Sequence, residues 1–266
     1  MIQDVFSVAG YNSLGGASIH SDIKAISTNC ANPMAAINAL TIQNTQGVIG
    51  IYLVLPPSVV DQVNAVSADF QMNEGLVSMI INADIVQVVS DVMWPGIDVS
   101  IILDPVIIAK VGALLLEDDT SAPVSNALMT LAIIITSKIP EAAHLLGSLQ
   151  ATKREEMLSH GRALCALGLN VVLMKCAHLD GDKSPDVLIT DIGANWFNSP
   201  EVRIESIHGT SCILSAMIAA QIAQAFNLPE AVSNPKTYFA TEILQADQFY
   251  VGSGCHPAHH FANLNN

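Results

Sequence analysis

The sequence predicts an α/β fold, in which helices cover both faces of a doubly wound and mostly parallel sheet. Short apolar runs rich in valine and isoleucine alternate with helical stretches along the chain, and this order is typical of right-handed crossovers between parallel strands. The runs are continuously apolar rather than alternating, which indicates strands buried on both faces. No linker, low-complexity tract or internal repeat divides the 266 residues, so we expect one domain over residues 1–266.

The N-terminal half is expected to open with a strand at Val5–Ala9, because a short apolar run there ends at a glycine. A second strand is expected at Val48–Leu53. It is followed by a helix at Ser58–Phe70, where apolar residues recur at helical spacing. A second helix at Ala83–Met93 then leads into a strand at Val99–Leu103.

The C-terminal half repeats this alternation. A strand is expected at Ala132–Ile135, a helix at Thr152–Leu167 and a strand at Val171–Lys175, followed by helices at Ser211–Phe226 and Pro229–Ala246. In sheets of this kind, ligands lie beyond the carboxyl ends of the strands, where loops lead into helices. We therefore expect the site in the loops that follow the strands and in the turn before the Ser211 helix.

The composition excludes several classes of partner. The formal net charge is −14 and charged residues make up only 13% of the chain, which argues against a nucleic-acid groove and against an anionic membrane surface. Backbone amides and one lysine could still hold a phosphate. The apolar share of 51% suggests that a second subunit covers part of the surface. Runs such as Leu131–Ile135 are far shorter than the ~18 residues of a membrane span.

Two features favour a cytoplasmic protein. Asp4 stands where a signal peptide would carry lysine or arginine, and no small-residue cleavage site follows a long apolar run. The five cysteines are odd in number and lack a paired spacing, so we expect reduced thiols.

A Gly-Thr turn opens the helix that contains Cys212. Gly209 and Thr210 precede it, and such a helix start presents free amides and a positive dipole end to an anion. A phosphoryl group in transfer would suit this position. In the first turn the dipole can lower the pKa of a thiol, which would make Cys212 a base or nucleophile. The alternative is a small buried cysteine at an ordinary helix start.

The first loop and the strand after it offer candidates for binding a small ligand. Gly10, Gly15 and Gly16 allow close approach of the backbone, and Asp22 lies just inside the following helix. The spacing lacks the G-x-G-x-x-G pattern of a dinucleotide site. Gln43 is expected near a loop, where it either hydrogen-bonds a ligand or is solvated.

Two charged residues are expected at the carboxyl ends of strands. Asp104 follows an apolar run and suits a Mg²⁺ ion bound partly through water. Lys175 ends another run and suits a nucleotide phosphate. Either residue alone would more often be a surface charge. Two charged residues that both fall at carboxyl ends of strands are less easily explained by chance.

Taken together, the motifs resemble the hydroxymethylpyrimidine/phosphomethylpyrimidine kinases, a branch of the ribokinase-like superfamily that also contains pyridoxal kinases. The resemblance covers nearly the whole chain, in the segments AGYNSLGGASIHSDIKA, ALTIQNTQGV, LDPVIIAKVG, IPEAAHLLG, GRALCALGLNVVLMKCAHL, SPDVL, IHGTSCILSA and PAHHF. The cysteine of the Gly-Thr-x-Cys turn favours this branch over relatives with aspartate there. The resemblance implies a ribokinase-like sheet, a homodimer, the use of ATP and Mg²⁺, and phosphorylation of hydroxymethylpyrimidine and its monophosphate in thiamine biosynthesis.

The resemblance also implies roles for individual positions. The residues implied to contact the aminopyrimidine are Gly10, Asp22, Gln43 and Met79. Those implied to form the anion hole are Gly209, Thr210, Ser211 and Cys212. Cys212 would assist deprotonation of the attacking hydroxyl, Lys175 and Thr210 would contact ATP phosphate, and Asp104 and Glu141 would lie near the metal.

Several positions depart from the family pattern. Ser211 replaces a glycine and would be strained in a left-handed conformation. Lys138 stands in place of an asparagine in the metal motif, where it would either repel the metal or partly replace its charge. The other changes are Tyr11, Asn12, Leu76, Ser78, Cys176 and Ala177.

These departures leave three functions open. The chain is an active kinase, a non-catalytic pyrimidine-binding protein on the same fold, or a kinase for pyridoxal or another small alcohol. Cys255, His256, His259 and His260 lie close together in the sequence, but zinc ligands usually come from two separated pairs. A structural metal in this tail is therefore the less favoured interpretation.

Overall fold

The computed structural model describes residues 1–79, 83–93, 99–107, 132–176, 179, 183–200, 207–246 and 251–261. Its centre is a nine-stranded sheet in the order β3-β2-β1-β4-β5-β6-β7-β8-β9. The strands are β1 (Asp4–Asn12), β2 (Asn32–Asn44), β3 (Gly47–Leu53), β4 (Glu74–Ser78), β5 (Ser100–Asp104), β6 (Ile134–Lys138), β7 (Val171–Lys175), β8 (Lys183–Thr190) and β9 (Gly193–Pro200). The six strands from β2 to β7 in this order run parallel, while β3, β8 and β9 are antiparallel at the edges. The predicted mostly parallel α/β sheet is confirmed.

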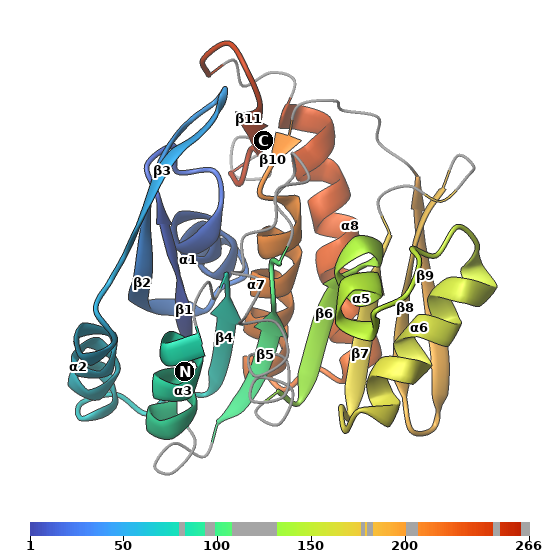
Figure 1. Cartoon of the computed structure of the whole chain (residues 1–266), viewed down its shortest axis with the longest axis horizontal. Helices are drawn as coiled ribbons and strands as arrows, with labels where there is room; N and C mark the ends of the chain where they lie inside the picture. The colour runs from blue at the N-terminus through green and yellow to red at the C-terminus, as the bar shows by residue number, and fades with distance from the viewer. Residues whose placement is uncertain are drawn as a thin grey trace.

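Helices cover both faces of the sheet (Figure 1). They are α1 (Ser18–Thr28), α2 (Pro56–Ser67), α3 (Ala83–Met93), α5 (Ile139–Leu146), α6 (Arg154–Ala166), α7 (Thr210–Ala223) and α8 (Leu228–Ala246). One apolar cluster joins the sheet to α2, α3, α5 and α6, and a second joins its other face to α1, α7 and α8. A short strand before α7, β10 (Ile207–His208), pairs in parallel with β11 (His256–Pro257), which lies near the C-terminus.

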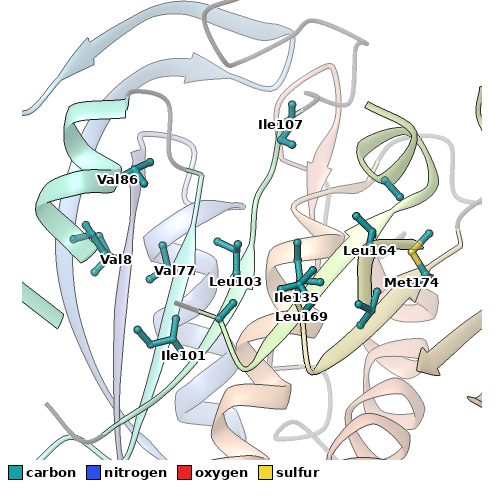
Figure 2. Packing of buried hydrophobic residues seen from close by; sticks show 14 of the residues in the cluster. Val8, Val77, Val86, Ile101, Leu103, Ile107, Ile135, Leu164, Leu169 and Met174 are labelled. Carbon is teal, nitrogen blue, oxygen red and sulfur yellow. The ribbon is translucent and has the colours of Figure 1, made fainter. Parts of the chain in front are cut away.

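The strand register explains why the apolar runs are continuous. Val8, Val77, Leu103 and Ile135 are register partners in successive strands and belong to the cluster under α3 and α6 (Figure 2). The neighbouring row, which includes Leu76, Ile102 and Ile134, belongs to the cluster under α1 and α7. Successive side chains of a strand point to opposite faces of the sheet. When helices cover both faces, every position is buried, so apolar residues do not alternate with polar ones.

The predicted elements fall on observed ones, with shifted ends. The run at Ala132–Ile135 belongs to β6, which begins two residues later, and the helix expected at Ser58–Phe70 is α2, which begins at Pro56. The sequence did not indicate β2, β4, β8, β9 or α5. The expectation of two covered faces is wrong for β3, because its apolar side chains, including Ile49 and Tyr52, are exposed in the single chain.

The topology places the expected site at the carboxyl ends of the central strands. From β1 the chain passes through α1 to β2 on one side, and it later returns to β4 on the other side. The carboxyl ends of β1 and β4 therefore form a topological switch point, where ligands bind in open α/β sheets. Within the described part of the chain, no helix is long and apolar enough to cross a membrane.

Candidate active site

The start of α7 has the geometry predicted for the Gly-Thr turn. Gly209 has a φ of 84°, and a Cβ there would lie 2.0 Å from the carbonyl oxygen of Gly16. Only glycine fits this contact between the first loop and α7. Because Gly209 carries no capping side chain, the amides of Thr210, Ser211 and Cys212 open the helix without a side-chain cap. These amides and the helix dipole suit an anion.

The structure joins Asp104 and Lys175, which the sequence suggested as separate ligands. Asp104 ends β5, Lys175 ends β7, and the ammonium nitrogen lies 3.0 Å from Asp104 Oδ1. Both side chains are buried. The Lys175 ammonium also donates to Thr136 Oγ1 at 3.0 Å and to Ser215 Oγ at 3.1 Å. This ion pair lies within a shell of hydroxyl groups.

Ser211 connects this ion pair to the helix start. Its hydroxyl contacts the Lys175 ammonium and donates to Asp104 Oδ2 at 3.1 Å. Ser215, one turn later in α7, donates to the same oxygen at 3.0 Å. Asp104 therefore accepts bonds on both carboxylate oxygens. The strain considered for Ser211 is absent, because its backbone lies in α7 and it is not among the residues with positive φ.

A second ion pair lies at the end of β6. The Lys138 ammonium is 3.3 Å from Glu141 Oε1, and the Lys138 amide donates to Glu141 Oε2 at 2.9 Å. Glu141 is fully buried in the first turn of α5. Burial alone would lower the pKa of Lys138, but the negative charges of Glu141 and Asp104 outweigh it and raise that pKa. Lys138 is therefore a cation held at the site.

The two carboxylates proposed as metal neighbours each carry an ammonium group instead. Asp104 is bonded by Lys175, and Glu141 is paired with Lys138. In residues 1–261, leaving out the stretches not described, no group of three or more His, Cys, Asp or Glu could hold a metal ion. That search includes the tail around Cys255. Both carboxylates are thus occupied by lysine ammonium groups, and Mg²⁺ that arrives with ATP enters as part of the substrate.

Asp22 of α1 lies against β1 and β4. It is fully buried in α1, and its Oδ2 accepts bonds from Ser7 at 2.7 Å and from Ser78 at 3.4 Å. Burial raises the pKa of Asp22 to about 8; the Ser7 bond opposes this rise and the Asp104 charge adds to it. Its Oδ1 has no hydrogen-bond partner among the described residues. At neutral pH Asp22 is therefore mainly a carboxylic acid with one free oxygen.

Met79 packs against Gly10, and the residue before it, Ser78, bonds Asp22. A Cβ at Gly10 would lie 2.8 Å from Met79 Cε, so a larger residue would displace the methionine. Met79 has a φ of 50°, and its carbonyl accepts a bond from Asn38 at 3.2 Å. Ser18, which has a φ of 54°, donates to Met79 Sδ at 3.2 Å. The left-handed backbone strain lies at Ser18 and Met79, not at Ser211.

Gln43 lies one residue before the end of β2, next to the turn into β3. Its backbone is bonded to the first loop: the Gln43 amide donates to Ser13 Oγ at 3.0 Å, and the Ser13 hydroxyl donates to the Gln43 carbonyl at 2.6 Å. Gln43 is thus held near the carboxyl ends of β1 and β2.

Cys212 is in the predicted place, but its pKa moves in the opposite direction. Burial raises the pKa of the thiol to about 12; the charges of Asp104 and Asp22 add to this rise, and a bond from the Ser18 amide opposes it. The helix dipole does not overcome the loss of solvent. Cys212 is therefore a neutral thiol, and the predicted low-pKa thiolate is wrong.

Sequence reasoning missed several residues of the site. Thr136 and Ser215, which surround Lys175, and Ser18 and Asn38, which hold Met79, are small polar residues without a distinctive spacing. No pattern in the sequence distinguished them. Of the altered loop after β7, Cys176 is buried, and Ala177 lies outside the described residues.

Comparison with known proteins gives a consistent result. A family model described as phosphomethylpyrimidine kinase matches residues 12–259. The hydroxymethylpyrimidine/phosphomethylpyrimidine kinase of Escherichia coli K12 is 36% identical over 258 residues, which cover 97% of each chain. The crystal structure of phosphomethylpyrimidine kinase from Clostridium difficile 630 has a TM-score of 0.80 at 29% identity, covering 90% of this chain and 98% of that one. An ADP complex of Bacillus subtilis pyridoxal kinase has a TM-score of 0.91 over the whole of both chains, but at 21% identity it shows the fold alone.

Proposed function

Because the chain belongs to the phosphomethylpyrimidine kinase family, we propose that it transfers phosphate from ATP to 4-amino-5-hydroxymethyl-2-methylpyrimidine and then to the monophosphate, in thiamine biosynthesis. The observation that carries this proposal is the arrangement around α7. The buried acid Asp22 is bonded to residues of β1 and β4, and the Asp104–Lys175 pair joins the ends of β5 and β7. An acceptor and a phosphoryl donor thus have separate groups to bind them near Cys212.

The phosphoryl group would lie at the start of α7. We propose that the amides of Thr210, Ser211 and Cys212 bind its oxygens, and that the ammonium of Lys175 contacts the ATP phosphates. The substrate hydroxyl oxygen attacks the γ-phosphorus, the bond from that phosphorus to the bridging oxygen of ADP breaks, and the hydroxyl proton passes to an oxygen of the transferred phosphoryl group. Phosphoryl transfer depends mainly on positioning and charge stabilisation, and preformed amides with a fixed ammonium supply both.

The role proposed for Cys212 follows from its neutral thiol. In a loose transition state the attacking hydroxyl keeps its proton until late, so a strong base contributes little. We propose that the thiol hydrogen-bonds the hydroxymethyl group and orients its oxygen toward phosphorus. Gly10, Gln43 and Met79 would hold the pyrimidine ring in place, and Asp22 would hydrogen-bond a ring nitrogen.

Magnesium enters this proposal with the nucleotide. Asp104 and Glu141 would lie near the metal of Mg·ATP and shape the charge around it, each balanced by its lysine. The pyridoxal alternative has weaker support, because the pyridoxal kinases share the fold at only 20–21% identity.

The exposed edge of the sheet supports a homodimer. The side chains of Ile49 and Tyr52 in β3 are 74% and 65% exposed, and Leu40 and Ile42 of β2 are also exposed. Contiguous apolar surface of this kind marks a protein interface. We propose that residues 1–266 act as one domain and that two copies meet through β2 and β3. Cys30, Cys165, Cys212 and Cys255 carry free thiols, which suits a reducing compartment and supports a cytoplasmic location.

The first test is ADP release coupled to a spectrophotometric assay, with ATP, Mg²⁺ and hydroxymethylpyrimidine, beside Cys212→Ala and the control Cys165→Ala. We expect turnover that needs the pyrimidine, a fall of roughly 10²-fold in kcat for Cys212→Ala, and no change for Cys165→Ala on α6. Turnover with pyridoxal in preference to the pyrimidine would favour the alternative acceptor. Pyrimidine binding without turnover at high enzyme concentration would identify a non-catalytic binding protein and contradict the proposal.

A further inference from the structure

Lys138 presents a cation at the carboxyl edge of the sheet. It is the last residue of β6, between the strands that end in Asp104 and Lys175. Its side chain is 32% exposed, whereas the Glu141 side chain with which it pairs is completely buried. The carboxylate thus lies in the protein, and the ammonium above it faces the side from which ligands approach.

The charges around Lys138 balance. Asp104 and Glu141 are the carboxylates, and Lys175 and Lys138 are the matching cations. Cys212 is also close enough for the ammonium to interact with it. Without Lys138 the site would carry one net negative charge, which would repel the phosphates of ATP. In a chain with a net charge of −14, distant residues do not compensate for this loss.

We infer that the Lys138 ammonium is a built-in cation of the phosphoryl-transfer site, where it takes the place of a divalent ion held by Glu141 and contacts the transferred phosphoryl group. This inference rests on the proposed function. It assigns a catalytic role to a residue that stands where the resemblance led us to expect an amide.

Two features of the site favour this role. An ammonium 3.3 Å from Glu141 Oε1 occupies the position that a metal bound to that oxygen would need. An ammonium is a compact point charge with three donors, so it can bond the carboxylate and a phosphoryl oxygen together. The nucleotide-free protein should therefore bind no divalent cation here, and catalysis should need only the ion carried by ATP.

The direct test is a titration of the nucleotide-free protein with Mn²⁺, in which electron paramagnetic resonance measures the bound ion. We expect no binding to the wild type at 1 mM, a concentration on the order of the weakest protein sites. Lys138→Asn and Lys138→Met should both gain a site with a Kd on the order of 0.1–1 mM, because Glu141 becomes available. Lys153→Met, which removes an exposed lysine at the start of α6, should gain none. Equal Mn²⁺ binding by the wild type and Lys138→Asn, or no gain in either Lys138 variant, would overturn the inference.

Kinetics provide the second readout. At saturating Mg·ATP, we expect wild-type kcat to be independent of added free Mg²⁺. Lys138→Asn should lose roughly 10²-fold in kcat at low free Mg²⁺ and recover part of it as free Mg²⁺ rises. Lys138→Arg keeps the charge and should retain activity with no Mn²⁺ site, and its melting temperature controls for loss of the Glu141 pair. If Lys138→Arg behaves like Lys138→Asn, the charge is not the active feature. A wild type without turnover would count against the proposed function, while the Mn²⁺ result would still stand alone.

Discussion

Asp22 shows how burial determines the chemistry of a single side chain in this site. A pKa of about 8 keeps the folded carboxyl protonated at neutral pH, although an exposed aspartate would be ionised. Oδ2 already accepts bonds from Ser7 and Ser78, so Oδ1, which lacks a partner among the described residues, is the oxygen available to a ligand. As an acid it would donate a hydrogen bond to a ring nitrogen of the proposed pyrimidine.

The protonation of Asp22 should therefore control pyrimidine binding. The acid predominates below its folded pKa, so KM for the pyrimidine should be constant from pH 6 to about 8 and then rise about tenfold per pH unit. Asp22→Asn keeps one donor and one acceptor and should bind without this pH dependence, whereas Asp22→Ala should lose about 10²-fold in kcat/KM. Steady-state kinetics across pH 6–10 would check this. A KM that falls as pH rises would instead identify the ionised carboxylate as the binding form.

Ser211 departs from the family pattern, and in the structure its side chain stabilises the Asp104–Lys175 ion pair. Its hydroxyl bonds both members of the Asp104–Lys175 pair, so we expect Ser211→Ala and Ser211→Gly each to lower kcat about 5–10-fold, as for one lost hydrogen bond. KM for the pyrimidine should be unchanged in both. The opposite result, a higher kcat in Ser211→Gly, would show that the side chain crowds the phosphate, as the sequence alone suggested. Ser148→Ala, at an exposed position after α5, serves as the control.

At the scale of elements, burial on two faces determines what the sequence reveals. The central strands β5, β6 and β7 are covered on both sides, and their uninterrupted apolar runs indicated them. The edge strands β8 and β9 carry polar residues, and β8 contains Pro185 and Asp186, which read as a loop. Asp186 is buried and paired with Lys236 of α8, a long-range contact that no local pattern predicts. Likewise α5 has Pro140 in its first turn, where proline is tolerated but resembles a break.

The sequence predicted the residues of the site in the same partial way. The sequence indicated Asp104 and Lys175 because each ends an apolar run, and Gly209 because it opens a helix. It could not show that the two charges neutralise each other, because 71 residues separate them and the sheet order brings β5 and β7 to either side of β6. Their hydroxyl partners carry no periodic signal.

The β2–β3 edge gives a prediction for assembly. The exposed apolar side chains of this edge would be covered in the proposed dimer, so Ile49→Asp and Tyr52→Glu should each shift the protein to a monomer in sedimentation velocity. A charge in an otherwise desolvated interface leaves an unpaired buried group and costs several kcal/mol. Leu149→Asp, at an even more exposed leucine between α5 and α6, should leave the mass unchanged. A wild-type protein that is already monomeric at micromolar concentration would contradict the proposed dimer.

At the scale of the whole molecule, three buried groups set how stability depends on pH. Burial raises the pKa of Glu74 to about 9 and that of Asp22 to about 8, so from about pH 4.5 to 8 the folded state keeps protons that the unfolded state has lost. These carboxyls make stability fall as pH rises. Burial lowers the pKa of His260 to about 3, with Lys24 adding to this effect, so its contribution falls as pH drops below about 6.5. Below about pH 6.5 the effect of His260 on stability opposes that of the two carboxyls. Above about pH 6.5, of these three groups, only the carboxyls change the stability.

Stability should therefore decline between pH 6.5 and 8, and Glu74 should account for about 2 kcal/mol of that decline, at about 1.4 kcal/mol per pH unit. Glu74→Gln, measured by urea unfolding at both values, should be the more stable protein at pH 8 and should lose that share of the slope. The exposed variant Glu155→Gln should keep the wild-type slope. An unchanged slope in Glu74→Gln would mean that Glu74 is ionised in the folded protein. Because Glu74 begins β4 and Met79 follows its far end, the same variant should leave kcat and KM unaltered, which separates a stability effect from a catalytic one.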